Sequence, residues 1–562
     1  MRRRVGGVLA AAAALAALLL AGCASLPSSG GVNAGSPGTG DEALELDLQA
    51  PSPTEGATQE EILRGFINAA TSPRSNYAVA RQYLAPEFAD QWQPGEGATI
   101  DRFADRDTLR VDDAHLQIDA VPAAELAANG QYQAAQSQAP IQLDYRFVKV
   151  GGEWRISEAP AGVLMDESNF SRVYRMHTLY YFDRDFRFAV PDVRWFAGRE
   201  SAQTSIVRAL LAGPADWLDA GVVSAFPEGV RLDPDAVPID GGVADVSLEG
   251  AAAADDELAA QRMRFQLKES LASVPNVDDV QLSLDGTVQT GALTFSAITD
   301  PTADARAVVY DGTTFGRLAG NGEAIEPIAG ISDQVAGLLP TAAALSPDAQ
   351  SAAVRSGEGD VFLVRAEAQP VRVDDRDDLI APAIDGSGYV WTVPADAPRE
   401  IRVSGPDGTS VAIQAPWSAI GIAALALAPD GTRLIALLDD AAGSRFVAVA
   451  VGRTADGAPQ ALGSVQLILA GEAGEAADVS WLDQTTVASL TATDGGSGIV
   501  SQVLGGLATR RDGPVGGEQL DAGVSPREYR VLTSDGDLET VSGVGWQIRA
   551  SGIRFLGSQL AG

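Results

Sequence analysis

The sequence predicts a multidomain protein in which an α+β domain and an α/β domain precede an all-β propeller. The chain has 562 residues, which is too long for one domain at roughly 100–200 residues each. Helical and strand patterns alternate up to about residue 300. Beyond that point helical periodicity vanishes, and short apolar strands alternate with Asp-Gly, Pro-Asp and Gly-Gly turns. Apolar residues make up 46% of the chain, which is enough to fill several cores.

The N-terminus has the features of a secretory signal peptide that ends in a lipobox. A positive segment at residues 2–4 precedes an uninterrupted apolar run at residues 8–20. Small residues then lead to Cys23, the single cysteine of the sequence. In bacterial lipoproteins with this arrangement, cleavage makes the cysteine the first mature residue and its sulfur carries a diacylglycerol, whose two acyl chains suffice for stable anchoring. The cleavage motif consists of Leu20, Ala21 and Gly22.

An uncleaved transmembrane anchor is the alternative, because residues 5–22 are just long enough to span a bilayer. Their glycines and alanines make a weak span, so the signal peptide is favoured. Residues 24–40 are rich in Ser, Gly and Pro, which predicts a short flexible linker that keeps the globular part close to the membrane. We therefore expect the protein at the extracytoplasmic face of the cell membrane, attached through the diacylglycerol on Cys23.

The first domain is predicted to place helices before an antiparallel sheet. Residues Thr58 to Glu61 have the pattern of a capping box, which starts a helix. A second short helix is predicted at residues 77–84, ending near Pro86. This order resembles the cone-shaped α+β fold of the nuclear-transport-factor superfamily, which says little about activity. The predicted strand runs are 109–121, 141–150 and, after a Gly151-Gly152 turn, 153–156.

The second domain is predicted to mix strands with two helices. Residues 202–211 form an amphipathic pattern that stops at Gly213-Pro214, a glycine cap followed by a residue that cannot continue the helix. A longer helix is predicted at residues 255–271. The predicted strands are 179–183, 186–195, 242–248 and 277–286.

The C-terminal half carries a loose repeat that predicts a β-propeller. The same type of turn recurs with aspartates at 348, 385, 430 and 483, and strands flank each turn. These spacings fit a four-stranded blade, which needs about 40–45 residues, with variable loops. A large β-sandwich is the alternative, but it would not need the same turn at blade-like intervals.

Composition excludes several classes of function. The net charge of −35 leaves no basic footprint for nucleic acid, and it should also repel the chain from anionic lipid headgroups. With Cys23 lipidated no thiol remains, and the two histidines, His115 and His177, stand alone in strand-like runs, where a structural role is favoured. No nucleophile elbow, phosphate loop or zinc motif occurs, so we expect no metal, no cofactor and no enzymatic activity. The acidic run at 374–378 predicts a solvated loop between blades rather than a calcium site, because EF-hand spacing is absent.

Several motifs of the second domain resemble the GerMN domain, and the whole chain resembles the LpqB family of actinobacterial lipoproteins. The family likeness rests on the order of lipobox, cone-like domain, GerMN-like domain and propeller. It implies an accessory protein that contacts the extracytoplasmic sensor region of the histidine kinase in an MtrAB-like two-component system, with a role in cell-envelope homeostasis and division. The GerMN-like segments are 181–183, 210–214, 224–229, 274–277 and 284–286. The predicted boundaries are 1–22 for the signal peptide, 23–40 for the lipidated linker, 41–165 for the cone-like domain, 166–297 for the GerMN-like domain and 298–562 for the propeller.

Two other functions stay open at this point. The protein could bind or process cell-wall glycan, using a carboxylate pair and exposed aromatic side chains. Trp391 lies within an apolar strand, however, and is expected to be a packing residue. A solute-binding lipoprotein would need two similar α/β lobes, which the turn-rich C-terminal half does not provide. The aromatic candidates for glycan binding are Trp391, Trp417, Trp481 and Trp546.

Overall fold

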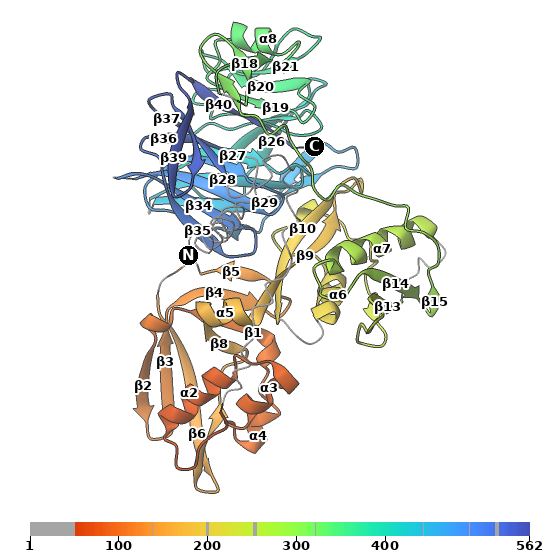
Figure 1. The fold of residues 1–562 in the computed structure, drawn as a ribbon, viewed down its shortest axis with the longest axis vertical. Coiled ribbons are helices and arrows are strands. Elements are labelled where there is room, and N and C mark those ends of the chain that lie inside the picture. Colours follow the sequence, from red (N-terminus) through yellow and green to blue (C-terminus); the bar gives the residue numbers. More distant parts are fainter. Residues whose placement is uncertain are drawn as a thin grey trace, which may run out of the picture. The chain divides into compact units, whose positions relative to one another are not determined.

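The computed structural model describes residues 51–561, except 136, 138, 198–201, 251–255, 321, 442, 494 and 523–527. The predicted signal peptide, the lipobox and the linker at 23–40 lie outside the described residues. An α+β region, a second region of mixed helices and strands, and an all-β region follow one another along the chain (Figure 1). The predicted fold class is confirmed.

The first region begins with the predicted capping box. The Thr58 hydroxyl accepts a hydrogen bond from the Glu61 N–H, and the Glu61 carboxylate accepts one from the Thr58 N–H. This cap starts α2, whose apolar face is buried against the sheet. The helices are α2 (Gln59–Ala69), α3 (Arg74–Arg81), α4 (Pro86–Ala89), η1 (Pro94–Glu96), η2 (Phe103–Asp105) and α5 (Glu167–Val173).

Two four-stranded sheets complete the first region, in the orders β2-β3-β6-β7 and β5-β4-β1-β8. The run predicted at 109–121 is divided, because the Asp112 carboxylate accepts a hydrogen bond from the Ala114 N–H and turns the chain into a hairpin. The Gly151-Gly152 hairpin is confirmed. The strands are β1 (Gly97–Asp101), β2 (Asp107–Asp112), β3 (His115–Ala120), β4 (Pro122–Ala127), β5 (Tyr132–Ala134), β6 (Ile141–Val150), β7 (Glu153–Glu158) and β8 (Val163–Asp166).

The second region contains a long hairpin and a small sheet against which two helices pack. The hairpin joins β9 (Tyr174–Phe182) to β10 (Ala189–Ala197), which pair along their whole length. Both predicted helices are present, as α6 (Ala202–Ala212) and α7 (Glu257–Leu271), and the Asp256 carboxylate caps α7. The remaining elements are η3 (Asp219–Gly221), β11 (Arg231–Leu232), β12 (Ile239–Asp240), β13 (Val243–Glu249), β14 (Asp279–Leu284) and β15 (Thr287–Val288).

The all-β region is a propeller with six four-stranded blades among the described residues. The C-terminal strand β40 pairs with β16 and so supplies the innermost strand of the first blade, which closes the ring. From the innermost strand outward, the first three blades are β40 (Phe555–Gln559), β16 (Val308–Tyr310), β17 (Phe315–Leu318), β18 (Ile325–Pro327); β19 (Ala342–Leu345), β20 (Ser351–Arg355), β21 (Val361–Arg365), β22 (Val371–Asp374); and β23 (Ala383–Ile384), β24 (Val390–Thr392), β25 (Glu400–Ser404), β26 (Ser410–Gln414).

The other three blades complete the ring, and α8 (Ser332–Gly337) lies between the first and second blades in the sequence. A short additional strand, β31 (Leu467–Ile468), pairs with β29. These blades are β27 (Gly421–Leu427), β28 (Arg433–Asp440), β29 (Gly443–Arg453), β30 (Pro459–Leu462); β32 (Glu475–Trp481), β33 (Thr486–Thr493), β34 (Gly496–Val503), β35 (Ala508–Gly513); and β36 (Gly517–Ala522), β37 (Tyr529–Thr533), β38 (Leu538–Ser542), β39 (Gly545–Ala550).

The predicted repeat corresponds to one structural turn. In four blades an aspartate carboxylate accepts a backbone N–H from the residue two positions later, just after the innermost strand. The turn therefore recurs once per blade in these four blades, which explains its spacing in the sequence, and the sandwich alternative is wrong. These aspartates are Asp348, Asp385, Asp430 and Asp483.

The acidic run at 374–378 is solvated only in part. Asp375, Asp377 and Asp378 are exposed, as predicted, whereas Asp374 is buried. Its carboxylate lies 2.7 Å from Arg376 and 2.6 Å from Arg402, so two guanidinium groups compensate the buried charge. The prediction of a wholly solvated loop is wrong at this residue.

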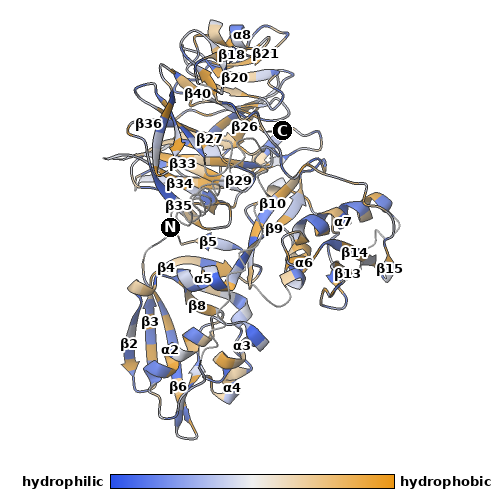
Figure 2. Ribbon diagram, viewed as in Figure 1, coloured by the Kyte–Doolittle hydropathy of each residue, from blue (hydrophilic) through white to orange (hydrophobic). Residues whose placement is uncertain are grey.

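Apolar residues concentrate in the propeller strands and along one side of the helices (Figure 2).

Candidate functional site at the domain junction

Strand β10 connects the first region with the second through a buried ion pair. Asp192 and Arg194 are 3% and 0% exposed, and their charged groups are 2.7 Å apart. Arg194 also donates to the carbonyl of Asn129 in the first region, and Asp192 accepts the N–H of Ala215 in the second. Charges this deeply buried need such partners, because an unpaired one carries a large desolvation penalty. The pair therefore fixes β10 against both regions.

The next residue of β10 joins the first region to the propeller. The Trp195 ring packs 4.8 Å from Phe170 in the core of the first region. Its indole N–H donates to the carbonyl of Gly505, 2.9 Å away, in the propeller. Gly505 has a φ of +76°, and a Cβ there would lie 3.0 Å from the Val193 carbonyl oxygen. Glycine thus permits the close approach of the propeller loop to β10.

The β9–β10 hairpin also packs against one face of the propeller (Figure 1). One continuous apolar cluster includes Leu179 and Tyr181 of β9 together with Ile435 and Phe446 of the propeller. The hairpin tip, from Asp183 to Phe188, and the turns after the innermost strands of three blades enclose a cavity of about 280 Å³. Burial raises the pKa of Asp183, and the nearby Asp430 raises it further.

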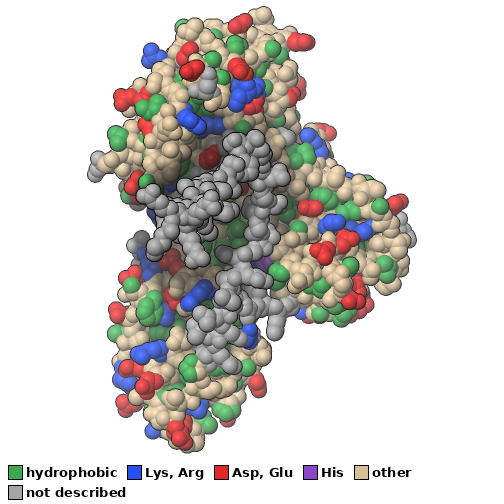
Figure 3. Space-filling view, in the orientation of Figure 1, with side chains coloured by type: hydrophobic (Ala, Val, Ile, Leu, Met, Phe, Trp, Pro, Cys, Tyr) green, Lys and Arg blue, Asp and Glu red, His purple; other side chains and the backbone are tan. Residues whose placement is uncertain are grey.

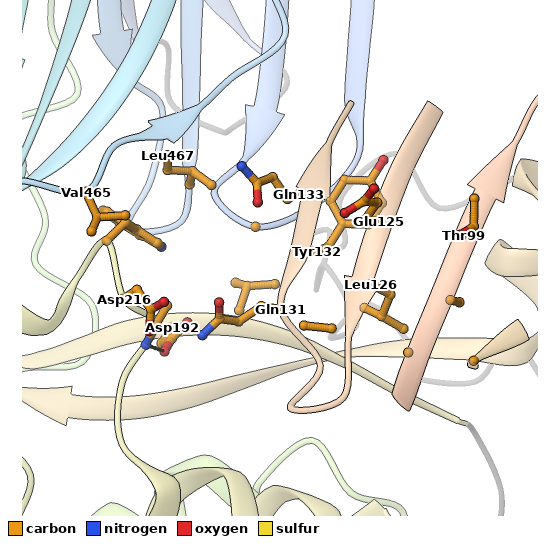
Figure 4. Close-up of a pocket in the computed structure, with 18 of the residues that line it drawn as sticks. Thr99, Glu125, Leu126, Gln131, Tyr132, Gln133, Asp192, Asp216, Val465 and Leu467 are labelled. Atoms are coloured by element: carbon orange, nitrogen blue, oxygen red, sulfur yellow. Dashed lines mark hydrogen bonds between the residues drawn. The ribbon is translucent and has the colours of Figure 1, made fainter. Parts of the chain in front are cut away.

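A second cavity, of about 430 Å³, lies where all three regions meet. Figure 4 shows Gln133 of the edge strand β5 on the side of Leu467 of the propeller, whereas the neighbouring Tyr132 ring packs toward Phe170, 5.7 Å away. Acidic side chains, among them Glu125 and Asp216, also line the cavity. Burial raises the pKa of Tyr132 to about 12, so its phenol stays protonated at neutral pH and can donate a hydrogen bond. The cavity therefore combines hydrogen-bonding groups with apolar surface, as binding clefts do.

The predicted lipidation residues, Cys23 with Leu20, Ala21 and Gly22, lie outside the described residues. Both histidines have structural contacts. The His177 ring is 2.8 Å from the Ser273 hydroxyl, and burial lowers its pKa. The His115 ring is 2.7 Å from the Asp144 carboxylate. Within the described ranges, no group of three His, Cys, Asp or Glu residues is arranged to hold a metal ion.

The four tryptophans considered for glycan binding are packed or bonded within the propeller. Trp391 and Trp417 are buried, as expected for Trp391. The Arg433 guanidinium lies 4.8 Å from the Trp481 ring, and the Trp546 indole donates to the Asp512 carbonyl. None of the four presents a free ring face together with a free N–H.

The residues that join the regions at β10 were not identified from the sequence. The segment from Phe186 to Trp195 was interpreted only as a strand. The sequence does contain a sign of the buried ion pair, because Asp192 and Arg194 lie on the same side of an otherwise apolar strand. Two opposite charges two residues apart in a buried strand indicate a buried pair, but its partners come from distant segments.

Comparison with known families agrees with this architecture. The model of the lipoprotein LpqB N-terminal domain matches residues 52–171, and the model of the LpqB beta-propeller domain matches residues 316–552. The chain belongs to the LpqB lipoprotein family. Between these two segments, residues 178–290 match the family described as sporulation and spore germination, Germane.

Relatives named lipoprotein LpqB occur in several actinobacteria. The protein of Thermobifida fusca is 32% identical over 49% of this chain and 46% of its own length. That of Cutibacterium acnes is 26% identical over 84% of this chain and 85% of its own length. The chain thus spans about half the length of the first of these relatives and most of the second. A chain of a solved nidogen–laminin complex aligns with 45% of this chain and 97% of its own length, at 11% identity and a TM-score of 0.34, which is too low to support an argument.

Proposed function

We propose that this LpqB-family protein is a lipid-anchored, extracytoplasmic accessory protein that regulates a sensor kinase of an MtrAB-like two-component system. The observation that carries the proposal is the family architecture, in which both LpqB domains flank a Germane domain. In this proposal the protein acts by binding rather than by catalysis.

The contacts of β10 support a binding scaffold. Asp192, Arg194 and Trp195 tie one strand to all three regions through buried polar contacts. These contacts hold β10 on both sides and so fix the three regions in one arrangement. Such an arrangement suits a protein that must present a fixed surface to a partner.

Anchoring and charge support the proposed location and partner. A diacylglycerol on Cys23 would confine the protein to two dimensions beside a membrane-embedded kinase, which raises the effective concentration of the two. Among the described residues no helix is long and apolar enough to cross a bilayer. Acidic side chains are spread over the visible face of the molecule (Figure 3), and the net charge is −35, so a basic partner surface would speed encounter.

The wall-glycan alternative has less support. Aromatic binding of sugars needs exposed ring faces, but Trp391 and Trp417 are buried and the Trp481 ring is covered by Arg433. Trp546 is half-buried and its indole N–H is bonded to the Asp512 carbonyl, so it makes a poor platform.

Crosslinking in the native membrane tests the proposal. The wild type should capture a sensor kinase, and Cys23→Ala should capture much less of it because the variant loses its anchor. The amount of folded Cys23→Ala protein in the soluble fraction is the control for expression. Capture of only wall glycan or glycan hydrolases, unchanged by Cys23→Ala, would contradict the regulator role.

A further inference from the structure

The two faces of the propeller can be distinguished by chain direction. The innermost strands of neighbouring blades run parallel, as β19 and β40 do, so the residues that precede these strands all lie on one face. The turns that follow the innermost strands lie on the other face. Three of those turns, near Asp348, Ser387 and Asp430, line the cavity under the β9–β10 hairpin. The face with these turns is termed the covered face, and the opposite one the open face.

Three strongly exposed apolar side chains lie at matching positions on the open face. Leu339, Ile420 and Val515 are 72%, 68% and 80% exposed. Each lies within three residues of the start of an innermost strand, namely β19, β27 and β36. These strands belong to alternate blades, so the three side chains are spaced around the ring on one face. Repeated placement of exposed apolar groups on one face indicates an interaction surface.

The backbone holds two of these side chains in place. Leu339 has a φ of +48°, which is unfavourable for a residue with a branched side chain. Beside it the Leu338 carbonyl accepts the N–H of Gly357. The Ile420 N–H donates to the Asp439 carbonyl, 2.9 Å away. A left-handed conformation at a non-glycine residue such as Leu339 persists only where the surrounding structure enforces it.

Exposed acidic residues lie in the connections of the same face. The connections between the second and third strands of a blade, and those that lead to the next blade, carry exposed carboxylates and few arginines. A complementary partner would therefore present basic side chains around an apolar centre. Examples of the acidic residues are Glu358, Asp375, Asp377, Asp396 and Asp535.

From this placement we infer that the open face binds the protein partner, and that the partner's contact surface is a basic one with apolar residues at its centre. The inference rests on the proposed function, since it takes the extracytoplasmic region of the sensor kinase as the occupant. On the covered face the hairpin of the same chain already lies over the turns of three blades, so we assign the partner contact to the open face.

The test is the affinity of the full-length, lipidated protein in liposomes for the purified extracytoplasmic region of the kinase. The test variant combines Leu339→Asn, Ile420→Gln and Val515→Asn, which remove apolar groups without adding charge. Val544→Asn is the matched control, because Val544 is 104% exposed and connects the third and fourth strands of its blade, on the covered-face side. We expect the triple variant to bind at least tenfold more weakly and the control to bind within twofold of wild type.

A second measurement addresses charge. The double variant Asp375→Asn, Asp377→Asn should lower the association rate several-fold, and added salt should remove that difference. If wild type binds the kinase and the triple variant binds equally well, the assignment of the contact to the open face is wrong while the proposed function stands. If wild type does not bind the kinase at all, the proposed function fails and the inference with it. Unchanged melting of the variants excludes loss of fold as the cause.

Discussion

The covered and open faces of the propeller differ in what lies on them. On the covered face, aspartates such as Asp430 and Asp483 bind backbone N–H groups, and the hairpin of the second region lies over several of these turns. On the open face, Leu339, Ile420 and Val515 remain in water. The difference suggests that one face is used to assemble the chain and the other to meet a partner.

Asp192→Ala should cause the largest loss of stability, in the hairpin that packs on the covered face. The change leaves the guanidinium of Arg194 buried without its carboxylate, which costs about 3–5 kcal/mol. Differential scanning calorimetry should show a lowered transition, and hydrogen exchange should rise along β9 and β10. The control is Asp240→Ala, at an exposed edge-strand residue of the same region, which should change little. Equal effects of the two variants would contradict a special role for the buried pair.

The partly buried Asp478 predicts a pH dependence in the propeller. Its carboxylate accepts the N–H groups of Val479 and Leu520, and burial raises its pKa to about 7. A carboxyl whose folded pKa is above its unfolded value stabilises the fold at low pH, and this contribution is lost as pH rises through the folded pKa. The shift from 3.8 to about 7 corresponds to about 4 kcal/mol at about 1.4 kcal/mol per pKa unit. Solvent screening of this partly exposed group reduces the loss expected between pH 4 and pH 8 to about 2 kcal/mol.

Thermal melting at pH 5, 6.5 and 8 measures this effect. Asp478→Asn should flatten the decline in melting temperature between pH 5 and pH 8, because the amide does not titrate. Asp535→Asn, at an exposed carboxyl of the propeller, should leave the decline as in wild type. A wild-type melting temperature that rises over this range would refute the assignment to Asp478.

Trp195→Phe should loosen the contact between β10 and the propeller. The change removes the indole N–H and leaves the Gly505 carbonyl without that donor, at a cost of about 1–2 kcal/mol. Faster hydrogen exchange is expected at residues 503–507, with the blade strands unchanged. Trp154→Phe, in a hairpin of the first region, is the control and should leave that segment as in wild type. Protection at 503–507 that stays the same in Trp195→Phe would show that the hydrogen bond does not hold the propeller loop.

Ile420→Gln should have the smallest effect on stability. Its side chain is 68% exposed, and such surface changes usually stay within about 0.5 kcal/mol. Partner binding should nevertheless weaken. A marked fall in melting temperature would show that Ile420 supports the fold and not the contact.

Local signals in the sequence account for much of the fold. The capping box at Thr58 and the hairpin at Gly151 were predictable, because neighbouring residues determine them. The recurring aspartate turns predicted a propeller, yet the number of blades required the pairing of β40 with β16, which are far apart in the chain. Asp374 was misjudged because its partner Arg402 comes from another blade.

The candidate sites were less predictable than the fold. The contacts of Arg194 and Trp195 join segments that are distant in sequence, and no local pattern reveals them. The exposure of Leu339 and Ile420 cannot be predicted from the sequence either, since an apolar residue before a strand is normally expected to be buried. Lipidation of Cys23 stays a prediction from the sequence.

Site-specific photo-crosslinking in the native membrane determines which face of the propeller contacts the sensor kinase. A photoreactive amino acid is placed at position 420 on the open face, and at position 544 on the other side as the control. We expect crosslinks from position 420 to a basic segment of the sensor kinase, and none from position 544. Crosslinks to the kinase from position 544 but not from position 420 would contradict this expectation.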